Sequence, residues 1–135
     1  MNVIIDTDVW SEAFRKQGSK SGYVDELQTL IEEGRAQLIG PVRQEILCGI
    51  RSEKQFDKVE ESLSAFPDKA VESAVYVLAA KFFNLCRSKG VQGSNTDFLI
   101  CACSVSWGYP ILTKDKDFLL FGQFLPCELL EPRNG

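Results

Sequence analysis

Acidic residues stand beside apolar segments at four separate places along this chain. They are Asp6 and Asp8, Glu45, Asp97, and Asp115 and Asp117. Carboxylates that gather in one place repel each other, so they cannot all stay ionised without a counter-charge. Mg²⁺ or Mn²⁺ would supply that charge, because both ions prefer oxygen ligands. Such an ion can orient a water molecule and neutralise charge on a phosphodiester. If the acids converge, the residue types therefore predict metal-dependent phosphodiester chemistry.

Each acid also has a plainer explanation as a helix residue. Asp is a favoured helix N-cap, so Asp6, Asp97 and Asp115 could each serve as a cap, and Glu45 could be a solvated helix residue. Asp97, however, would be redundant beside Thr96. Capping also does not account for an apolar run, residues 3–5, that ends in two acids. Taken together, the acids favour a shared site over separate caps.

The rest of the composition limits the possible chemistry. The chain has no histidine, which removes Ser-His-Asp and Cys-His catalysis and any histidine-ligated metal. The net charge of −4 argues against broad electrostatic binding to nucleic acid. It leaves open an acidic pocket that recruits a cation, and through it a phosphate. The five cysteines are odd in number and lack CxxC spacing, so we expect structural thiols.

The size of the chain suits a single domain, residues 1–135. Its 44% hydrophobic and 25% charged residues are those of an ordinary soluble globular protein. The apolar stretches are far shorter than a membrane span of about 20 residues. The N-terminus lacks the basic and apolar regions of a signal peptide. We therefore expect a cytoplasmic protein without a membrane segment.

Apolar runs alternate with segments of helical spacing along the whole chain. Strands are expected at 2–6, 36–41, 109–113 and 127–131, with a weak strand near 65–71. Helices are expected at about 9–17, 23–34, 42–50, 53–66, 70–89, 96–108 and 114–122. This alternation predicts an α/β fold with a parallel sheet covered on both faces. The carboxyl ends of parallel strands face one crevice, which would bring the separate acids to one place.

Four blocks of the sequence together resemble the PIN-domain ribonucleases, in particular the VapC-type toxins of prokaryotic toxin–antitoxin pairs. "VIIDTDVWSE" is similar to the family's opening strand with its first acid, Asp6. "RQEILCGI" resembles the helix that carries the second acid, Glu45. "GSNTDFLICACSVSWG" resembles the block with the third acid, Asp97. "ILTKDKDF" is similar to the block in which Thr113 and Asp115 end the fourth strand. The resemblance covers nearly the whole chain.

The resemblance implies a three-layer α/β/α fold with a central, mostly parallel five-stranded sheet. It implies an endoribonuclease that depends on Mg²⁺ or Mn²⁺ and is inhibited by a small antitoxin. The implied metal ligands and catalytic residues are Asp6, Glu45, Asp97 and Asp115. Thr7 and Thr113 would orient a carboxylate or a water through their hydroxyls.

Other implications concern neighbouring residues and assembly. Many relatives have Asn at the position of Asp8, which here could ligate metal, accept a hydrogen bond or hold the turn. The role of Asp117 is open. Because RNA must approach an acidic pocket, basic residues should surround it, and Arg43, Lys114 and Lys116 are the candidates. The implied homodimer would use the helices at about 23–34 and 41–64.

Two other functions are compatible with parts of the sequence. "IIDTDV" also matches the opening of haloacid-dehalogenase-type phosphatases, in which Asp6 would be a nucleophile and Asp8 a general acid. A non-catalytic PIN-like binding module is the second alternative. Its protein interface would be formed by large apolar residues that otherwise belong to the core, namely Phe82, Phe83, Trp107 and Phe121.

Overall fold

A small parallel sheet lies at the centre of the computed structural model, which describes residues 1–133. Its strands are β1 (Val3–Ile5), β2 (Ala36–Gln37) and β3 (Ile111–Leu112), in the order β2-β1-β3. Ile4 of the central strand is paired with Gln37 on one side and Ile111 on the other. The three residues of β1 are fully buried, as expected for a strand that is covered on both faces.

The expectation of five strands is wrong for the residues described. The segments near 65–71 and 127–131 each make one isolated parallel bridge, Leu38 with Asp68 and Ile111 with Leu129. These bridges continue the parallel arrangement beyond β2 and β3 without forming strands. The first segment contains Pro67 and the second follows Pro126, and the side chains of both are mostly exposed or half-buried. Such edge segments have little apolar surface to bury, so little stabilises regular pairing there.

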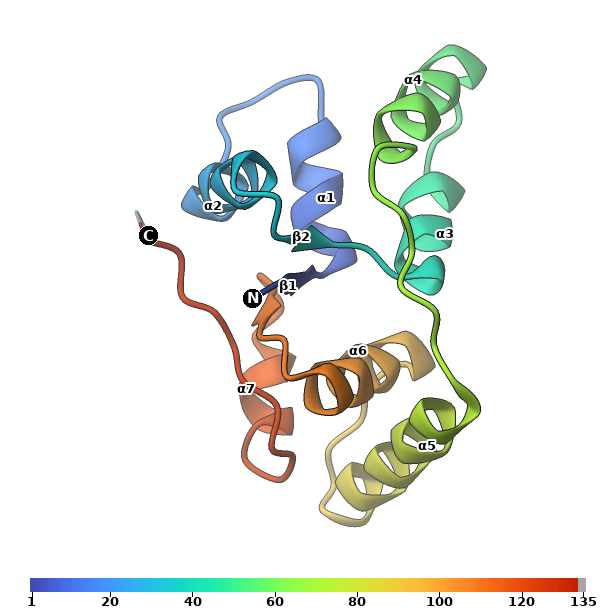
Figure 1. Cartoon of the computed structure of the whole chain (residues 1–135), viewed down its shortest axis with the longest axis vertical. Coiled ribbons are helices and arrows are strands. Elements are labelled where there is room, and N and C mark those ends of the chain that lie inside the picture. The colour runs from blue at the N-terminus through green and yellow to red at the C-terminus, as the bar shows by residue number, and fades with distance from the viewer. Residues whose placement is uncertain (134–135) are drawn as a thin grey trace.

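Helices flank this sheet on both sides. Their bounds are α1 Thr7–Phe14, α2 Gly22–Glu32, α3 Gly40–Cys48, α4 Glu53–Leu63, α5 Ser73–Ser88, α6 Asn95–Trp107 and α7 Asp117–Phe121. Figure 1 shows α1 and α2 on one side of the strands and α5, α6 and α7 on the other. The alternating order and the parallel pairing confirm the predicted α/β class. The long helix α5 packs along α6, which separates it from the sheet.

The apolar helix α6 begins earlier than its sequence indicates. Ser94 is its N-cap, because the Ser94 hydroxyl accepts a hydrogen bond from the Asp97 N–H at 3.0 Å. The Asp97 carboxylate in turn accepts one from the Ser94 N–H at 3.0 Å, which completes a capping box. Gly108 ends the helix at φ 70°, a left-handed conformation that suits glycine. The capping box fixes the position of Asp97 at the first turn.

The loop before α6 packs closely against α7. A Cβ atom at Gly93 would lie only 2.6 Å from the ring of Phe121, so this position requires glycine. Phe121 also packs against Phe98, with ring centroids 4.8 Å apart. These contacts fix the first turn of α6 relative to the segment that follows β3. Two of the acidic places in the sequence are thereby held in register.

The aromatic residues considered for an interface belong mainly to the core. Phe82 and Phe121 are buried, while Phe83 and Trp107 are partly buried against the same cluster.

The five cysteines are free thiols, as expected, and burial raises the pKa of Cys103 to about 12. Among the helices of residues 1–133, none combines the length and apolarity that a membrane crossing requires.

Candidate active site

Asp6 lies where β1 passes directly into α1. It is the N-cap of α1, and its Oδ1 accepts a hydrogen bond from the Thr7 N–H at 2.7 Å. Its Oδ2 accepts a hydrogen bond from the Thr113 hydroxyl at 2.7 Å, which joins the ends of β1 and β3. Only 6% of the residue is exposed. Burial and the nearby charge of Asp8 raise the pKa of Asp6 to about 7, although both hydrogen bonds lower it.

Asp8 stands in the first turn of α1 and faces the segment after β3. Its carboxylate accepts a hydrogen bond from the Lys114 backbone N–H at 3.2 Å. Burial raises the pKa of Asp8, the bond from Lys114 lowers it, and the charge of Asp115 raises it again. Of the three roles that the sequence leaves open for Asp8, the structure shows that of hydrogen-bond acceptor. Asp8 therefore ties the end of β3 to α1.

Asp115 is positioned by its backbone neighbours. Its N–H donates to the Thr113 hydroxyl at 3.0 Å, and that hydroxyl donates to Asp6. Oδ1 of Asp115 accepts a hydrogen bond from the Asp117 N–H at 2.9 Å. The Asp117 carboxylate itself belongs to an exposed residue in the first turn of α7. The contact observed for Asp117 is thus through its backbone, which orients Asp115.

Glu45 reaches the same region from α3. Its Oε1 accepts a hydrogen bond from the Thr7 hydroxyl at 2.7 Å, so α1 and α3 meet beside the acids. The sequence predicts an orienting role for Thr7, and this contact is consistent with it. Because Thr7 also donates its N–H to Asp6, one residue contacts two of the predicted ligands.

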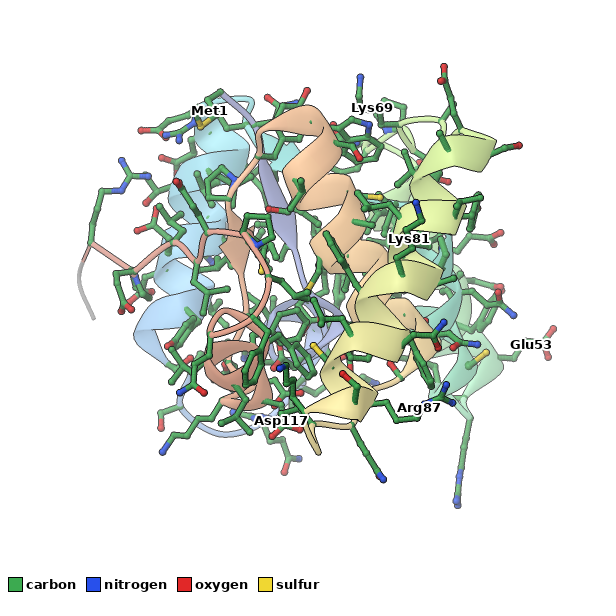
Figure 2. The ribbon with its side chains drawn as sticks, turned by 90° about the horizontal axis from the view of Figure 1, so that it is seen from below. Met1, Glu53, Lys69, Lys81, Arg87 and Asp117 are labelled. Atoms are coloured by element: carbon green, nitrogen blue, oxygen red, sulfur yellow. The ribbon has the colours of Figure 1, made fainter. Side chains whose placement is uncertain are left out.

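The predicted acids influence one another electrostatically, so they lie in one neighbourhood. The pKa of Asp97 is raised, first by burial and then by the charges of Asp115 and Glu45, against the lowering effect of its bonds with Ser94. The charge of Asp97 in turn contributes to the raised pKa of Asp6. Figure 2 shows Met1 at one edge of the molecule and Asp117 at the opposite edge, and β1 runs from the side of Met1 toward that of Asp117. The acids therefore collect at the carboxyl ends of β1 and β3.

The donor set suits a hard divalent cation. Carboxylate oxygens are the ligands that Mg²⁺ and Mn²⁺ prefer. Within residues 1–133, no three acidic or thiol side chains approach closely enough to form a ready-made cage. Mg²⁺ usually keeps several waters and binds through one or two carboxylates, so such a cage is not required. The buried Asp6 receives hydrogen bonds from two neutral donors and forms no salt bridge within residues 1–133, so a bound metal ion would stabilise its ionised form.

One of the basic residues predicted to surround the acidic pocket, Arg43, is bound to another part of the chain. Arg43 has its guanidinium committed to the segment that follows α4. It donates to both carboxylate oxygens of Asp68, at 3.2 Å for the closest, and to the Leu63 carbonyl at 3.0 Å. It also donates to the Phe66 carbonyl. Four of the five N–H groups of Arg43 are used in this way, so its main role is to stabilise the fold.

A groove beside the acids contains basic residues that the sequence reasoning missed. It has a volume of about 710 Å³ and is lined by Asp8 and Glu45. Lys114, a predicted contact, also lines it, together with Arg15, Lys16 and Arg51. The last three are far from the acids in sequence, which is why proximity to the motifs did not reveal them. Each directly follows an amphipathic segment, which is the signal that could have drawn attention to them.

Comparisons with known proteins bear on this site. No family model matches the chain. A VapC ribonuclease of Mycobacterium bovis and the ribonuclease VapC11 of Mycobacterium tuberculosis are each 31% identical to it over 119 residues. That alignment spans 86% of this chain and 88% of either relative.

Solved structures show the same fold. The structure of VapBC2 from Rickettsia felis bound to a promoter DNA fragment matches with a TM-score of 0.74 at 17% identity, over 97% of this chain and 98% of that one. A toxin–antitoxin complex from Klebsiella pneumoniae matches with a TM-score of 0.64 at 14% identity, over 87% of this chain and 90% of that one. Together with the 31% identity to VapC proteins, these matches confirm the resemblance seen in the sequence: the chain belongs to the VapC ribonuclease family.

Proposed function

We propose that this chain is a metal-dependent endoribonuclease that hydrolyses RNA phosphodiester bonds and acts as the toxin of a toxin–antitoxin pair. The observation that carries the proposal is the convergence of acids from separate segments, because the Thr113 hydroxyl joins Asp6 to the end of β3 and the Thr7 hydroxyl joins Glu45 to the start of α1. Membership of the VapC family supports the activity. The same membership speaks against the phosphatase alternative. The proposed surroundings are the cytoplasm, and the proposed fold is the three-layer PIN arrangement.

The residues proposed to hold Mg²⁺ or Mn²⁺ are Asp6, Glu45, Asp97 and Asp115. When bound, such a cation activates water for attack on phosphorus and neutralises charge on the phosphodiester. The chain itself contributes the orientation of the carboxylates. The Thr113 hydroxyl holds Asp6, and the Thr7 hydroxyl holds Glu45. These bonds restrict the rotation of both carboxylates before any ligand arrives.

Cleavage by the purified protein tests this proposal. We expect a circular single-stranded RNA to be cut in the presence of Mn²⁺ or Mg²⁺, because an endonuclease needs no chain end. EDTA should stop the reaction, and excess Mn²⁺ should restore it, since the carboxylates alone cannot activate water. Gel analysis of the linear products measures the rate. Cleavage that continues unchanged in EDTA would contradict the metal-dependent mechanism.

We also propose that the protein binds a small antitoxin and forms a homodimer. The toxin–antitoxin complex from Klebsiella pneumoniae has the same fold as this chain, which supports an antitoxin partner. The helices predicted for the dimer contribute one exposed large apolar side chain among residues 1–133, Ile31 of α2. Helix α5 instead exposes Tyr76, Val77 and Leu85, at 51%, 56% and 41%. We propose α5 as the dimer surface, and the competing surface is the α7 region, which exposes Leu119, Leu120 and Phe124 at 59%, 45% and 36%.

Sedimentation velocity tests the assignment of the dimer surface. The wild-type protein should sediment as a dimer at micromolar concentration, because an exposed apolar surface gains free energy when a second copy covers it. Val77→Glu should shift the protein toward the monomer, since it places a charge in that surface. Leu120→Glu on α7, another exposed position, serves as the matched control and should remain a dimer. If Val77→Glu sedimented as a dimer, as Leu120→Glu is expected to do, α5 would not be part of the interface.

A further inference from the structure

Lys114 is held at both ends beside the acid cluster. Its backbone N–H donates to the Asp8 carboxylate at 3.2 Å. Its ammonium lies 3.0 Å from Oε1 of Glu12, a side chain that is 5% exposed. The Lys114 side chain is itself 35% exposed, and it lines the groove that also contains Asp8 and Glu45. A positive charge is thus fixed in the groove next to the predicted ligands.

The buried Glu12 organises more than this lysine. Its Oε2 accepts a hydrogen bond from the Ser21 N–H and its Oε1 accepts one from the Ser21 hydroxyl, both at 2.7 Å. Ser21 is the last residue of the loop between α1 and α2. That loop contains Arg15 and Lys16, two other basic residues of the groove. Burial alone would raise the pKa of Glu12, but the bonds from Ser21 and Lys114 lower it to about 2. Glu12 therefore stays anionic and keeps both partners in place.

The donors of Lys114 differ from those of the structural cations in this chain. The Arg133 guanidinium binds Glu26 and Glu33 through Nε and both terminal nitrogens. Arg43 likewise uses all of its nitrogens on protein acceptors. An ammonium has three N–H donors, and the one partner of the Lys114 ammonium among residues 1–133 is Glu12. Lys114 thus retains two donors at the surface of the groove.

We propose that Lys114, oriented by Glu12, binds a backbone phosphate of single-stranded RNA in the groove beside the acid cluster. The inference rests on the proposed function, because it names how the substrate of that site is held. Phosphate is the occupant favoured by charge, since the four basic side chains that line the groove outnumber its three carboxylates. Glu12 is a positioning residue and does not itself contact the RNA.

Orientation by Glu12 has a physical advantage for a protein of net charge −4. A free lysine side chain loses rotamer entropy when it binds, because several flexible bonds become fixed. A lysine already held at both ends loses less, so more of the phosphate attraction appears as affinity. Binding at the acid cluster also needs a local positive charge, because the carboxylates repel phosphate. Lys114 supplies that charge without occupying the proposed metal position.

RNA binding without cleavage tests the phosphate contact. Fluorescence anisotropy would be measured with a labelled single-stranded RNA in EDTA, over a range of KCl concentrations that starts at low salt. We expect Lys114→Gln to weaken binding several-fold and to reduce the salt slope by about 0.7, the value for one phosphate contact on a single strand. Lys114→Arg should retain binding. Lys69→Gln is the matched control, because Lys69 is exposed, does not line the groove and lies on the Met1 side of the molecule, opposite Asp117 (Figure 2).

A steady-state assay with Mn²⁺ separates binding from chemistry. Lys114→Gln should raise KM several-fold and change kcat by less than about threefold, because the lysine holds substrate and does not activate water. Normal cleavage combined with unchanged RNA binding in Lys114→Gln would overturn this inference alone. Weakened binding in Lys114→Gln with no cleavage by the wild-type protein would overturn the proposed function alone. Absence of RNA binding by the wild-type protein at low salt would overturn the inference as well.

A double-mutant cycle tests the role of Glu12. Glu12→Gln keeps the shape of the side chain but removes the anion that orients Lys114. We expect the effect of Lys114→Gln on RNA affinity to shrink at least threefold in the Glu12→Gln background. Additive effects would overturn the positioning role. An octaglutamate peptide is the last probe: if Lys114→Gln weakens its binding but leaves RNA binding unchanged, the lysine contacts an acidic protein partner and the inference is overturned.

Discussion

Asp6→Asn is expected to lower the rate of RNA cleavage by at least about a hundredfold while the protein remains folded. Asparagine has nearly the same volume as aspartate, and its carbonyl can still accept the Thr7 N–H at the start of α1. It lacks the charge that attracts a divalent cation. Asp97→Asn should reduce cleavage similarly, because Asp97 lies in the same electrostatic neighbourhood. Initial rates with saturating Mn²⁺ are the measurement.

The control for this loss is an aspartate outside the site. Asp57 is exposed on α4, and Asp57→Asn removes the same charge from the chain as a whole. We expect its cleavage rate to match that of the wild-type protein. If Asp6→Asn or Asp97→Asn cleaved RNA at nearly the wild-type rate, that residue would have no role in holding the metal. A rate that fell equally in Asp57→Asn would point to net charge as the cause.

The fold was predictable wherever burial and local spacing agreed. Residues 3–5 are apolar and fully buried, so the central strand was evident from composition. The prediction of strands at the two edges was wrong. Their apolar residues suggested strands, but each segment makes only one isolated bridge, at Asp68 and at Leu129. The start of α6 also differed, since a capping box between Ser94 and Asp97 depends on side-chain geometry. Helical periodicity cannot reveal which polar residue acts as the cap.

The acids of the site were predictable for a different reason. The carboxyl ends of parallel strands meet in one crevice, so Asp6 and Asp115 had to approach each other once their strands were adjacent. The basic surroundings were not predictable in this way. Arg43 is close to Glu45 in sequence, but its side chain turns toward Asp68. Lys114 could be named from sequence, whereas its partner Glu12 required the tertiary structure.

Without metal, wild-type stability is expected to fall as the pH rises from about 4 to about 7. The pKa of Asp6 is about 7 in the folded protein, against 3.8 for an aspartate exposed to water. The folded state therefore binds more protons than the unfolded state in this interval, and deprotonation disfavours folding. The difference between the two values corresponds to about 4 kcal/mol above pH 7. Glu12 has a lowered pKa of about 2, so the stability that it contributes is lost only as the pH falls below about 5.

Asp6→Asn should remove most of this dependence. In EDTA at pH 8 the variant is expected to melt up to about 16 °C above the wild-type protein, at about 4 °C for each kcal/mol in a domain of this size. At pH 4 the two should melt within a few degrees, because Asp6 is then protonated in the folded protein and about half protonated in the unfolded chain. Asp97→Asn should raise the melting temperature less than Asp6→Asn does, since it also weakens the capping hydrogen bond from the Ser94 N–H. Thermal melts by circular dichroism at both pH values measure the difference.

Metal should reverse the order of the two proteins. At pH 8, Mn²⁺ is expected to raise the melting temperature of the wild-type protein, because the ion binds the folded acids and not the unfolded chain. Asp6→Asn should respond much less, since it lacks a buried carboxylate to neutralise. Asp57→Asn should respond as the wild-type protein does. If Asp6→Asn and wild type gained equally from Mn²⁺, Asp6 would lie outside the metal site, and its raised pKa would be a cost of joining β1 to α1 that no ligand relieves.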